Sequence, residues 1–277
     1  MYSEKCLEYA YEGHIENPLR VKQAMEILEG LGYEIIEPVA ASEEDLLKVH
    51  TERWINQVKK GDSIDLDTPG GKTIYEQSLL SAGSAITAAN VGGFSVSRPP
   101  GHHAGRDGKA LGAPSLGFCY FNNMAVATRH LNKRTLIVDI DGHHGNGTQD
   151  IFHGDPSVIY VSLHGVVDFP GTGAESVDNC INIPLRVKLG DDQYMDALES
   201  AIDQIDMAQI EVIGISAGFD AHEGEIASLC LTSKCYKRIG EKIRSLNKFF
   251  FGVLEGGYSG IIVGESIDQL IQGLEGR

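Results

Sequence analysis

The amino-acid sequence predicts a three-layer α/β/α fold with a mostly parallel central sheet. Short runs rich in β-branched residues alternate regularly with longer amphipathic stretches along the chain. Two of these runs, at 136–140 and 212–215, are almost continuously apolar, which is typical of strands covered by helices on both faces of a parallel sheet. No proline-rich or serine-rich linker and no repeat divides the chain, so we expect a single domain over residues 1–277.

The elements follow in order from length and periodicity. Runs of five to eight residues with β-branched or aromatic side chains predict strands at 34–39, 94–98, 135–141, 158–164, 180–185, 212–219 and 249–255. The longer stretches between them predict helices at 19–31, 42–59, 73–91, 122–131, 191–205, 232–246 and 264–274.

Composition excludes several classes of protein. The chain has 23 Lys and Arg against 39 Asp and Glu, a net charge of -16, which opposes direct nucleic-acid binding and favours cationic ligands, although an acidic surface also serves solubility alone. Acidic residues occupy the N-terminus where a signal peptide needs an apolar stretch, and no apolar run is long enough to cross a membrane. We therefore expect a cytoplasmic protein without a membrane partner. Nothing in these features predicts the oligomeric state.

The five cysteines are scattered at wide intervals and form no CxxC pair. This pattern predicts reduced thiols rather than a disulfide framework or a cysteine zinc site.

Four polar clusters follow predicted strands. In open parallel sheets the active site lies outside the carboxyl ends of the strands, so these clusters are the first candidates for chemistry. They are RPPGHHAG (98–105), DIDGHHGNG (139–147), GFDAHEGE (218–225) and LEGGYSG (254–260).

The second and third clusters contain candidate metal ligands. Side chains alternate along a strand, so Asp139, Asp141 and His143 are expected to project to one side. Asp220 ends another apolar strand and supplies a further carboxylate. Asp141, His143 and Asp220 together would form a mixed nitrogen and oxygen site for a catalytic divalent metal. The alternatives are that each Asp caps a helix and that His143 is a hydrogen-bonded core residue.

Two adjacent imidazoles and one phenol complete the candidate chemistry. His102 and His103 follow a proline-glycine turn, and an imidazole exchanges protons near neutral pH. Tyr258 follows two glycines, and its hydroxyl could donate to a developing oxyanion. Phe118 and Phe169 lie on separate loops and could form the walls of a narrow channel for an alkyl chain. The alternatives are histidines bonded to loop carbonyls, a tyrosine packed over a turn, and aromatic loop anchors.

Taken together, these motifs resemble those of the zinc-dependent histone deacetylase superfamily, which includes acetylpolyamine amidohydrolases and has an arginase-like α/β fold. The resemblance begins near GHIENPLR (13–20), and Asn146 with the RPPGHHA form is similar to the class II and microbial branches. SAGFDAHEGEIASL lacks the Asp-Pro pair that commonly follows this motif in microbial members. The ordered motifs are RPPGHHAG, GFCYFNN, DIDGHHGNGTQDIF, VSLHG, FPGTG, SAGFDAHEGE and LEGGYS.

The resemblance implies a role for each matching residue. It implies that Zn2+ or another divalent metal is held by Asp141, His143 and Asp220. It also implies that His103 is the general base with His102 as its partner, that Asn146 lies beside His103, and that Tyr258 stabilises the oxyanion. Asp139 would support His102. A monovalent cation, K+ or Na+, would lie among Asp139, Asp141, His143, Ser162 and Leu163. Substrate would contact Gly117, Phe118, Phe169 and, at the rim, Asp67.

We therefore expect hydrolysis of an N-acyl amide, most simply N-acetyl on a lysine-like or polyamine amine. The partner would be an acetylated small amine or an acetyl-lysine protein. The alternative enzyme, a ureohydrolase with two manganese ions, would need additional bridging carboxylates, and HHGNG with the Gly-Gly-Tyr ending favours the amidohydrolase instead. A catalytically silent binder of acyl-lysine or polyamine would be expected to have lost Tyr258 or a metal ligand.

Overall fold

The computed structural model describes residues 1–277 and contains one six-stranded sheet in which every paired strand is parallel. The strand order is β1-β6-β5-β2-β3-β4. The predicted α/β fold with a parallel sheet is confirmed. The strands are β1 (Phe94–Ser95), β2 (Thr135–Asp139), β3 (Val158–Gly165), β4 (Cys180–Leu185), β5 (Val212–Ala217) and β6 (Phe249–Leu254).

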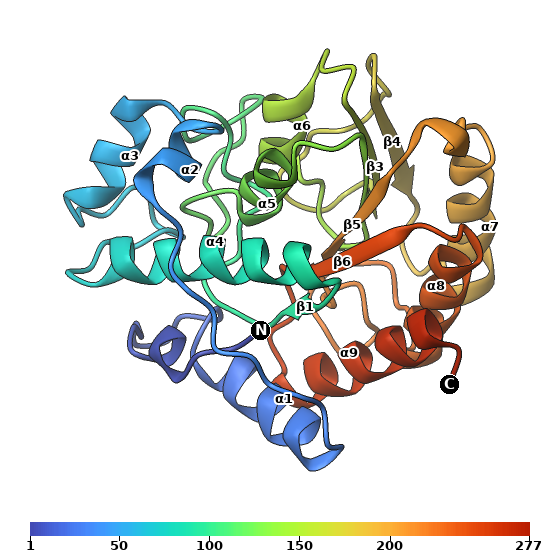
Figure 1. Ribbon diagram of the computed structural model, residues 1–277, viewed down its shortest axis with the longest axis horizontal. Coiled ribbons are helices and arrows are strands. Elements are labelled where there is room, and N and C mark those ends of the chain that lie inside the picture. The colour runs from blue at the N-terminus through green and yellow to red at the C-terminus, as the bar shows by residue number, and fades with distance from the viewer.

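Helices cover both faces of the sheet (Figure 1). One layer packs α1 (Leu19–Gly30), α7 (Asp191–Ile202), α8 (Ser233–Ser245) and α9 (Gly260–Glu275) against it. The other contains α2 (Glu43–Leu47), α3 (Glu52–Lys59), α4 (Ile74–Val91), α5 (Asn123–Leu131) and α6 (Asn146–Phe152). Two short 3-10 helices, η1 (Glu4–Leu7) and η2 (Met207–Gln209), pack against the same apolar cluster as α1.

The alternation of side chains along β2 divides the core between the two layers. Leu136 and Val138 belong to the apolar cluster beneath α1, α8 and α9, whereas Ile137 belongs to the cluster beneath α4 and α5. All five residues of β2 are buried. A strand covered by helices on both faces has no solvent-facing position, which explains the apolar run in its middle.

The predicted strand at 34–39 is wrong, because this segment has no regular structure. Ile35 and Ile36 are both more than one-third exposed, so neither side chain is buried against a face of the sheet. The N-terminal residues instead lie beside β1, where Val96 N donates to Met1 O at 2.9 Å. The strand at 94–98 is also shorter than predicted, because only Phe94 and Ser95 pair with β6.

The predicted helix at 42–59 is divided into α2 and α3. Thr51 begins the second helix, because its hydroxyl accepts a hydrogen bond from Trp54 N at 3.2 Å and caps the first turn. His50 lies buried in the interruption, where its Nε2 accepts from Asn122 N at 2.9 Å. Helix α6 was not predicted, because Gly145 and Gly147 in its first turn indicate a loop.

Other boundaries differ by a few residues. The strands predicted to end at 141, 219 and 255 end at Asp139, Ala217 and Leu254. Helix α9 begins at Gly260, four residues before its predicted start.

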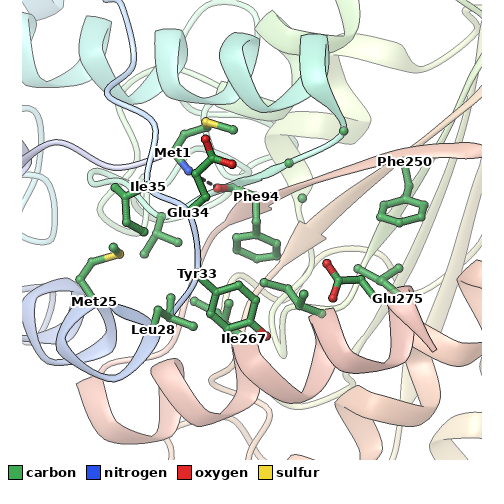
Figure 2. A pocket seen from close by; sticks show the side chains of 16 residues that line it. Met1, Met25, Leu28, Tyr33, Glu34, Ile35, Phe94, Phe250, Ile267 and Glu275 are labelled. Atoms are coloured by element: carbon green, nitrogen blue, oxygen red, sulfur yellow. Dashed lines mark hydrogen bonds between the residues drawn. The ribbon is translucent and has the colours of Figure 1, made fainter. Parts of the chain in front are cut away.

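An apolar pocket of about 300 Å³ lies beside β1 at the edge of the sheet, and Figure 2 shows the side chains that line it. It is lined by side chains from α1, α9 and the starts of β1 and β6, among them Met25, Leu28, Phe94, Phe250 and Ile267. None of the predicted site residues lines it. No helix of the chain combines the length and apolarity needed to cross a membrane.

Candidate active site

The candidate site lies at the carboxyl ends of the strands, where the loops after β1, β2, β5 and β6 meet. These four strands are consecutive neighbours in the sheet, so the residues that follow them converge. Asp139 is the last residue of β2, whereas Asp220 and Tyr258 follow β5 and β6. The polar clusters predicted from separate parts of the sequence therefore come together.

Three side chains at this end could hold a metal ion. One donor atom from each of Asp141, His143 and Asp220 lies within 4.8 Å of the other two, and all three residues are buried. His143 Nδ1 lies 3.1 Å from Asp141 Oδ1 and 2.9 Å from Asp220 Oδ2. Two carboxylates and one imidazole form a donor set that suits zinc and other divalent ions and leaves positions for water and substrate. The residues therefore fit a catalytic metal.

Backbone groups and glycines fix the two carboxylates. Gly256 N donates to Asp141 Oδ2 at 2.8 Å, and Gly142 N donates to Asp220 Oδ1 at 2.8 Å. A Cβ atom at Gly218 would lie 2.0 Å from Asp141 Oδ2, and one at Gly256 would lie 2.2 Å from Asp220 Oδ2. Only glycine therefore fits at these two positions beside the donors.

The two imidazoles of His102 and His103 lie next to this donor set, with ring centroids 4.0 Å apart. His102 Nδ1 lies 3.1 Å from Asp139 Oδ2, and its Nε2 lies 3.8 Å from Asp141 Oδ2. His103 Nδ1 lies 2.7 Å from Asn146 Oδ1. One imidazole thus faces carboxylates and the other a neutral amide.

These different partners shift the pKa values of the two imidazoles in opposite directions. Burial opposes the charged form of His102, but the carboxylates of Asp141 and Asp139 outweigh it and raise the pKa to about 10. Burial and the neighbouring charge of His102 hold the pKa of His103 well below its ordinary value. The carboxylates thus favour the protonated form of His102, whereas burial and the neighbouring His102 favour the neutral form of His103.

The Tyr258 phenol belongs to the loop after β6, the loop whose Gly256 N also binds Asp141. Burial and the carboxylates of Asp220 and Asp141 raise its pKa well above the usual value, so the hydroxyl keeps its proton and can donate it. Its ring packs edge-on against Phe118, with centroids 5.7 Å apart. The Arg20 guanidinium lies 5.3 Å from the ring centroid.

The predicted aromatic walls adjoin these groups. Phe169 packs edge-on against His103 with centroids 4.9 Å apart, and Phe118 packs against His14 at 4.9 Å. Gly117 packs closely against His103 and Phe169. A Cβ atom at Gly117 would lie 2.6 Å from His103 Cδ2 and 2.9 Å from Phe169 Cε1. Phe118 itself has a φ of 71°, a left-handed conformation that is unfavourable for an aromatic residue.

Asp67 is exposed and lies beside the segment that carries Phe118. Its Oδ2 accepts a hydrogen bond from Ser115 Oγ at 2.7 Å, and its backbone carbonyl lies 3.2 Å from His14 Nε2. This arrangement places Asp67 near the aromatic wall, and its contact with substrate stays a prediction.

The residues predicted to hold a monovalent cation lie around the ends of β2 and β3. Asp139 and Ser162 are partners in the register of these strands, and Leu163 follows in the buried part of β3. Asp139 Oδ2 also accepts from Tyr160 Oη at 2.8 Å. The structure thus brings part of this set together through neighbouring strands, and cation binding stays a prediction.

A buried carboxylate beneath the histidine pair was not assigned from the sequence. Glu255 Oε2 accepts from Gly101 N at 2.7 Å and from His102 N at 3.1 Å, and its Oε1 accepts from Ser216 Oγ at 2.7 Å. Burial raises the pKa of Glu255 to about 7. The available signal was a charged residue at the end of an apolar strand. Glu255 therefore orients the backbone that carries both imidazoles.

His144, adjacent to His143 in the sequence, does not join the donor set. Its Nδ1 lies 2.7 Å from Thr172 Oγ1, and its Nε2 lies 2.9 Å from Gln149 Oε1. It therefore supports the loop after β3.

Comparison with known proteins identifies the family. A family model described as a histone deacetylase domain matches residues 14–274. A probable deacetylase of Archaeoglobus fulgidus is 38% identical, over 81% of this chain and 69% of that protein. An acetylpolyamine amidohydrolase of Pseudomonas aeruginosa is 36% identical, over 77% of this chain and 66% of that protein. The crystal structure of the HDA15 HD domain aligns with a TM-score of 0.90 and 30% identity, covering 100% of this chain and 88% of that one.

The chain therefore belongs to the histone deacetylase family, as the sequence motifs predicted. Its relatives are named as deacetylases and amidohydrolases, which supports an enzyme that removes acetyl groups from amides.

Proposed function

We propose that this protein hydrolyses N-acetyl amides of lysine-like or polyamine amines with the help of a bound zinc ion. The observation that carries this proposal is the convergence of the Asp141, His143 and Asp220 donors with the His102–His103 pair and the loop of Tyr258 at one end of the sheet. The net charge of -16 also favours an amine substrate.

Each group has a separate task in the hydrolysis. Asp141, His143 and Asp220 would hold a divalent ion, which would supply Lewis acidity to the acyl carbonyl and to the attacking water. His103 accepts a proton as the water oxygen bonds to the carbonyl carbon. The Tyr258 hydroxyl donates a hydrogen bond to the oxygen that gains negative charge. The carbon–nitrogen bond then breaks, an imidazolium protonates the departing amine, and acetate and free amine leave.

The surrounding residues prepare these tasks. Asn146 Oδ1 accepts the Nδ1–H of His103, which leaves Nε2 as the proton acceptor of the neutral ring. Phe118 and Phe169 border the approach to the donors, as expected for a channel that admits an unbranched alkyl amine. A monovalent cation near Asp139 and Ser162, and Asp67 as a contact at the rim, belong to the same proposal.

Substitution of Tyr258 by Phe tests the proposal. The variant removes one oxyanion donor, so we expect kcat to fall about 100- to 1000-fold while the bound metal, measured by elemental analysis, is unchanged. Substrates should include a fluorogenic acetyl-lysine amide, an acetylated lysine peptide and an acetylated polyamine. Their relative kcat/KM values separate the two classes of amine.

Chelation provides the matching control. Removal of the metal should abolish wild-type turnover, and added Zn2+ should restore it. Absence of turnover on every acetyl substrate by the metal-loaded protein would contradict the proposal. Equal losses of activity and metal in Y258F would contradict the role given to the tyrosine.

A further inference from the structure

Glu225 makes a group of contacts that the hydrolysis above does not use. It lies in the loop after β5 and is half-buried. Its Oε1 and Oε2 atoms accept hydrogen bonds from Tyr258 N at 2.9 and 3.0 Å, and Oε1 also accepts from Ser259 N at 2.6 Å. One carboxylate therefore binds the backbone of two consecutive residues in the tyrosine loop.

This carboxylate also completes the start of α9. Ser259 is the N-cap residue of that helix, and its own side chain makes no capping hydrogen bond. The first N–H groups of a helix have no partner within the helix, and a negative charge is favourable there. Glu225 supplies that charge from more than thirty residues away in the sequence.

The tyrosine loop needs such support because glycines precede it. Gly256 and Gly257 have no side chains to pack, and Gly257 has a φ of 107°. Glycine gives the backbone many accessible conformations, so the direction of the next side chain depends on backbone contacts. The Arg20 guanidinium donates to the carbonyls of Glu255 and Gly257. Glu225 binds the N–H groups on the following residues, so the loop is held at both ends.

The loop that carries Glu225 is itself tied to a candidate metal ligand. Ala227 N donates to Asp220 O at 3.0 Å, and Glu225 N donates to His222 O at 2.9 Å. Glu225 therefore links the backbone of Tyr258 to the loop that begins at Asp220. Asp220 supplies one of the three candidate metal donors. The Tyr258 hydroxyl must lie at a fixed place relative to those donors to stabilise an oxyanion.

We propose that Glu225 is a positioning residue that holds the Tyr258 hydroxyl in place for the deacetylation. It touches neither the metal donors nor the substrate and acts through the backbone of Tyr258 and Ser259. The inference rests on the proposed function for its effect on turnover, whereas its effect on the loop does not depend on any activity.

The kinetic test compares E225A with E223A. Glu223 is exposed, lies in the same loop and makes no side-chain hydrogen bond, so E223A is a matched control. A misplaced catalytic group costs up to about 100-fold in rate, so E225A should lower kcat about 10- to 100-fold with little change in KM. E225Q should lose less, because its amide oxygen still accepts one hydrogen bond. E223A should match the wild type.

Combination with Y258F distinguishes positioning from general damage. If Glu225 acts through the phenol, E225A should cause less than a twofold further loss of kcat in a Y258F background. A loss as large as in the wild-type background would overturn the proposal, as would a kcat for E225A within twofold of the wild type. Metal content and the melting temperature of each variant show whether the donors and the fold are retained.

Hydrogen exchange of the tyrosine loop tests the inference without any activity. Mass spectrometry of peptides covering 255–262 should show faster amide exchange in E225A than in the wild type or E223A, because two N–H groups lose their acceptor. Unchanged exchange would overturn the positioning role. A wild-type protein inactive on all acetyl substrates, with faster exchange in E225A, would refute the proposed function and keep the structural role of Glu225.

Discussion

Replacement of Glu16 by Gln tests a buried ion cluster beneath the tyrosine loop. The Glu16 carboxylate accepts hydrogen bonds from Arg98 Nε at 2.6 Å and Arg98 Nη2 at 2.7 Å, and from Tyr9 Oη at 2.9 Å. Arg20 Nη1 lies 3.3 Å from the same carboxylate. Both arginines have fully buried side chains, and Glu16 is the only carboxylate within 4.0 Å of either.

The size of the expected effect follows from this burial. Glutamine keeps the shape but leaves two buried guanidinium groups without a counter-charge, which costs about 3–5 kcal/mol of unfolding free energy. An unfolding entropy of about 2.1 cal/mol/K per residue gives roughly 0.58 kcal/mol/K for this chain. We therefore expect E16Q to lower the melting temperature by about 5–9 °C.

Differential scanning calorimetry at neutral pH, with equal metal loading, measures this change. E12Q is the matched control, because Glu12 is exposed and has no side-chain partner, and it should melt within about 1 °C of the wild type. A melting temperature for E16Q within 2 °C of E12Q would refute the reasoning that the two arginines depend on this carboxylate.

Two further substitutions test the channel and a buried imidazole. G117A should lower kcat/KM at least about 10-fold at unchanged metal content, because the added methyl meets His103 and Phe169, and normal steady-state kinetics would contradict that packing. H50Q concerns stability: burial lowers the pKa of His50 to about 4, below its unfolded value of about 6.5, so the folded state loses stability as pH falls from 6.5 towards 4. Denaturant titrations at pH 7.5 and 5 should show a loss about 2 kcal/mol smaller in H50Q than in the wild type, and equal losses would rule out this role.

The sequence predicted those elements whose pattern reflects burial. The strands from 135 onward were found because a parallel strand between two helical layers is apolar on both faces. The segment at 34–39 also contains β-branched apolar residues, yet it does not pair as a strand. Composition alone does not distinguish these two environments. The short helix α6 was missed because glycine has low helix propensity, and here tertiary contacts decide the structure.

For the candidate site, the types of residue and the order of the motifs identified more of the site residues than the hydrophobic pattern did. Asp141, His143 and Asp220 were singled out because polar residues at strand ends meet in a parallel sheet. Glu225 and Glu255 were missed as supporting residues because they act on backbone N–H groups distant in the sequence. Any carboxylate can accept such bonds, so the residue type carries no signal, and only the folded chain shows which N–H groups are near.

The apolar pocket at the β1 edge is a place where substitutions can change thermal stability without touching the residues proposed for catalysis. Side chains that line a surface pocket lack close protein neighbours on one side, so a larger side chain that fits there adds packing contacts. The pocket shares no residue with the group of donors and imidazoles at the strand ends. Evolution or protein engineering can therefore adjust thermal tolerance at this edge while the polar end keeps its geometry.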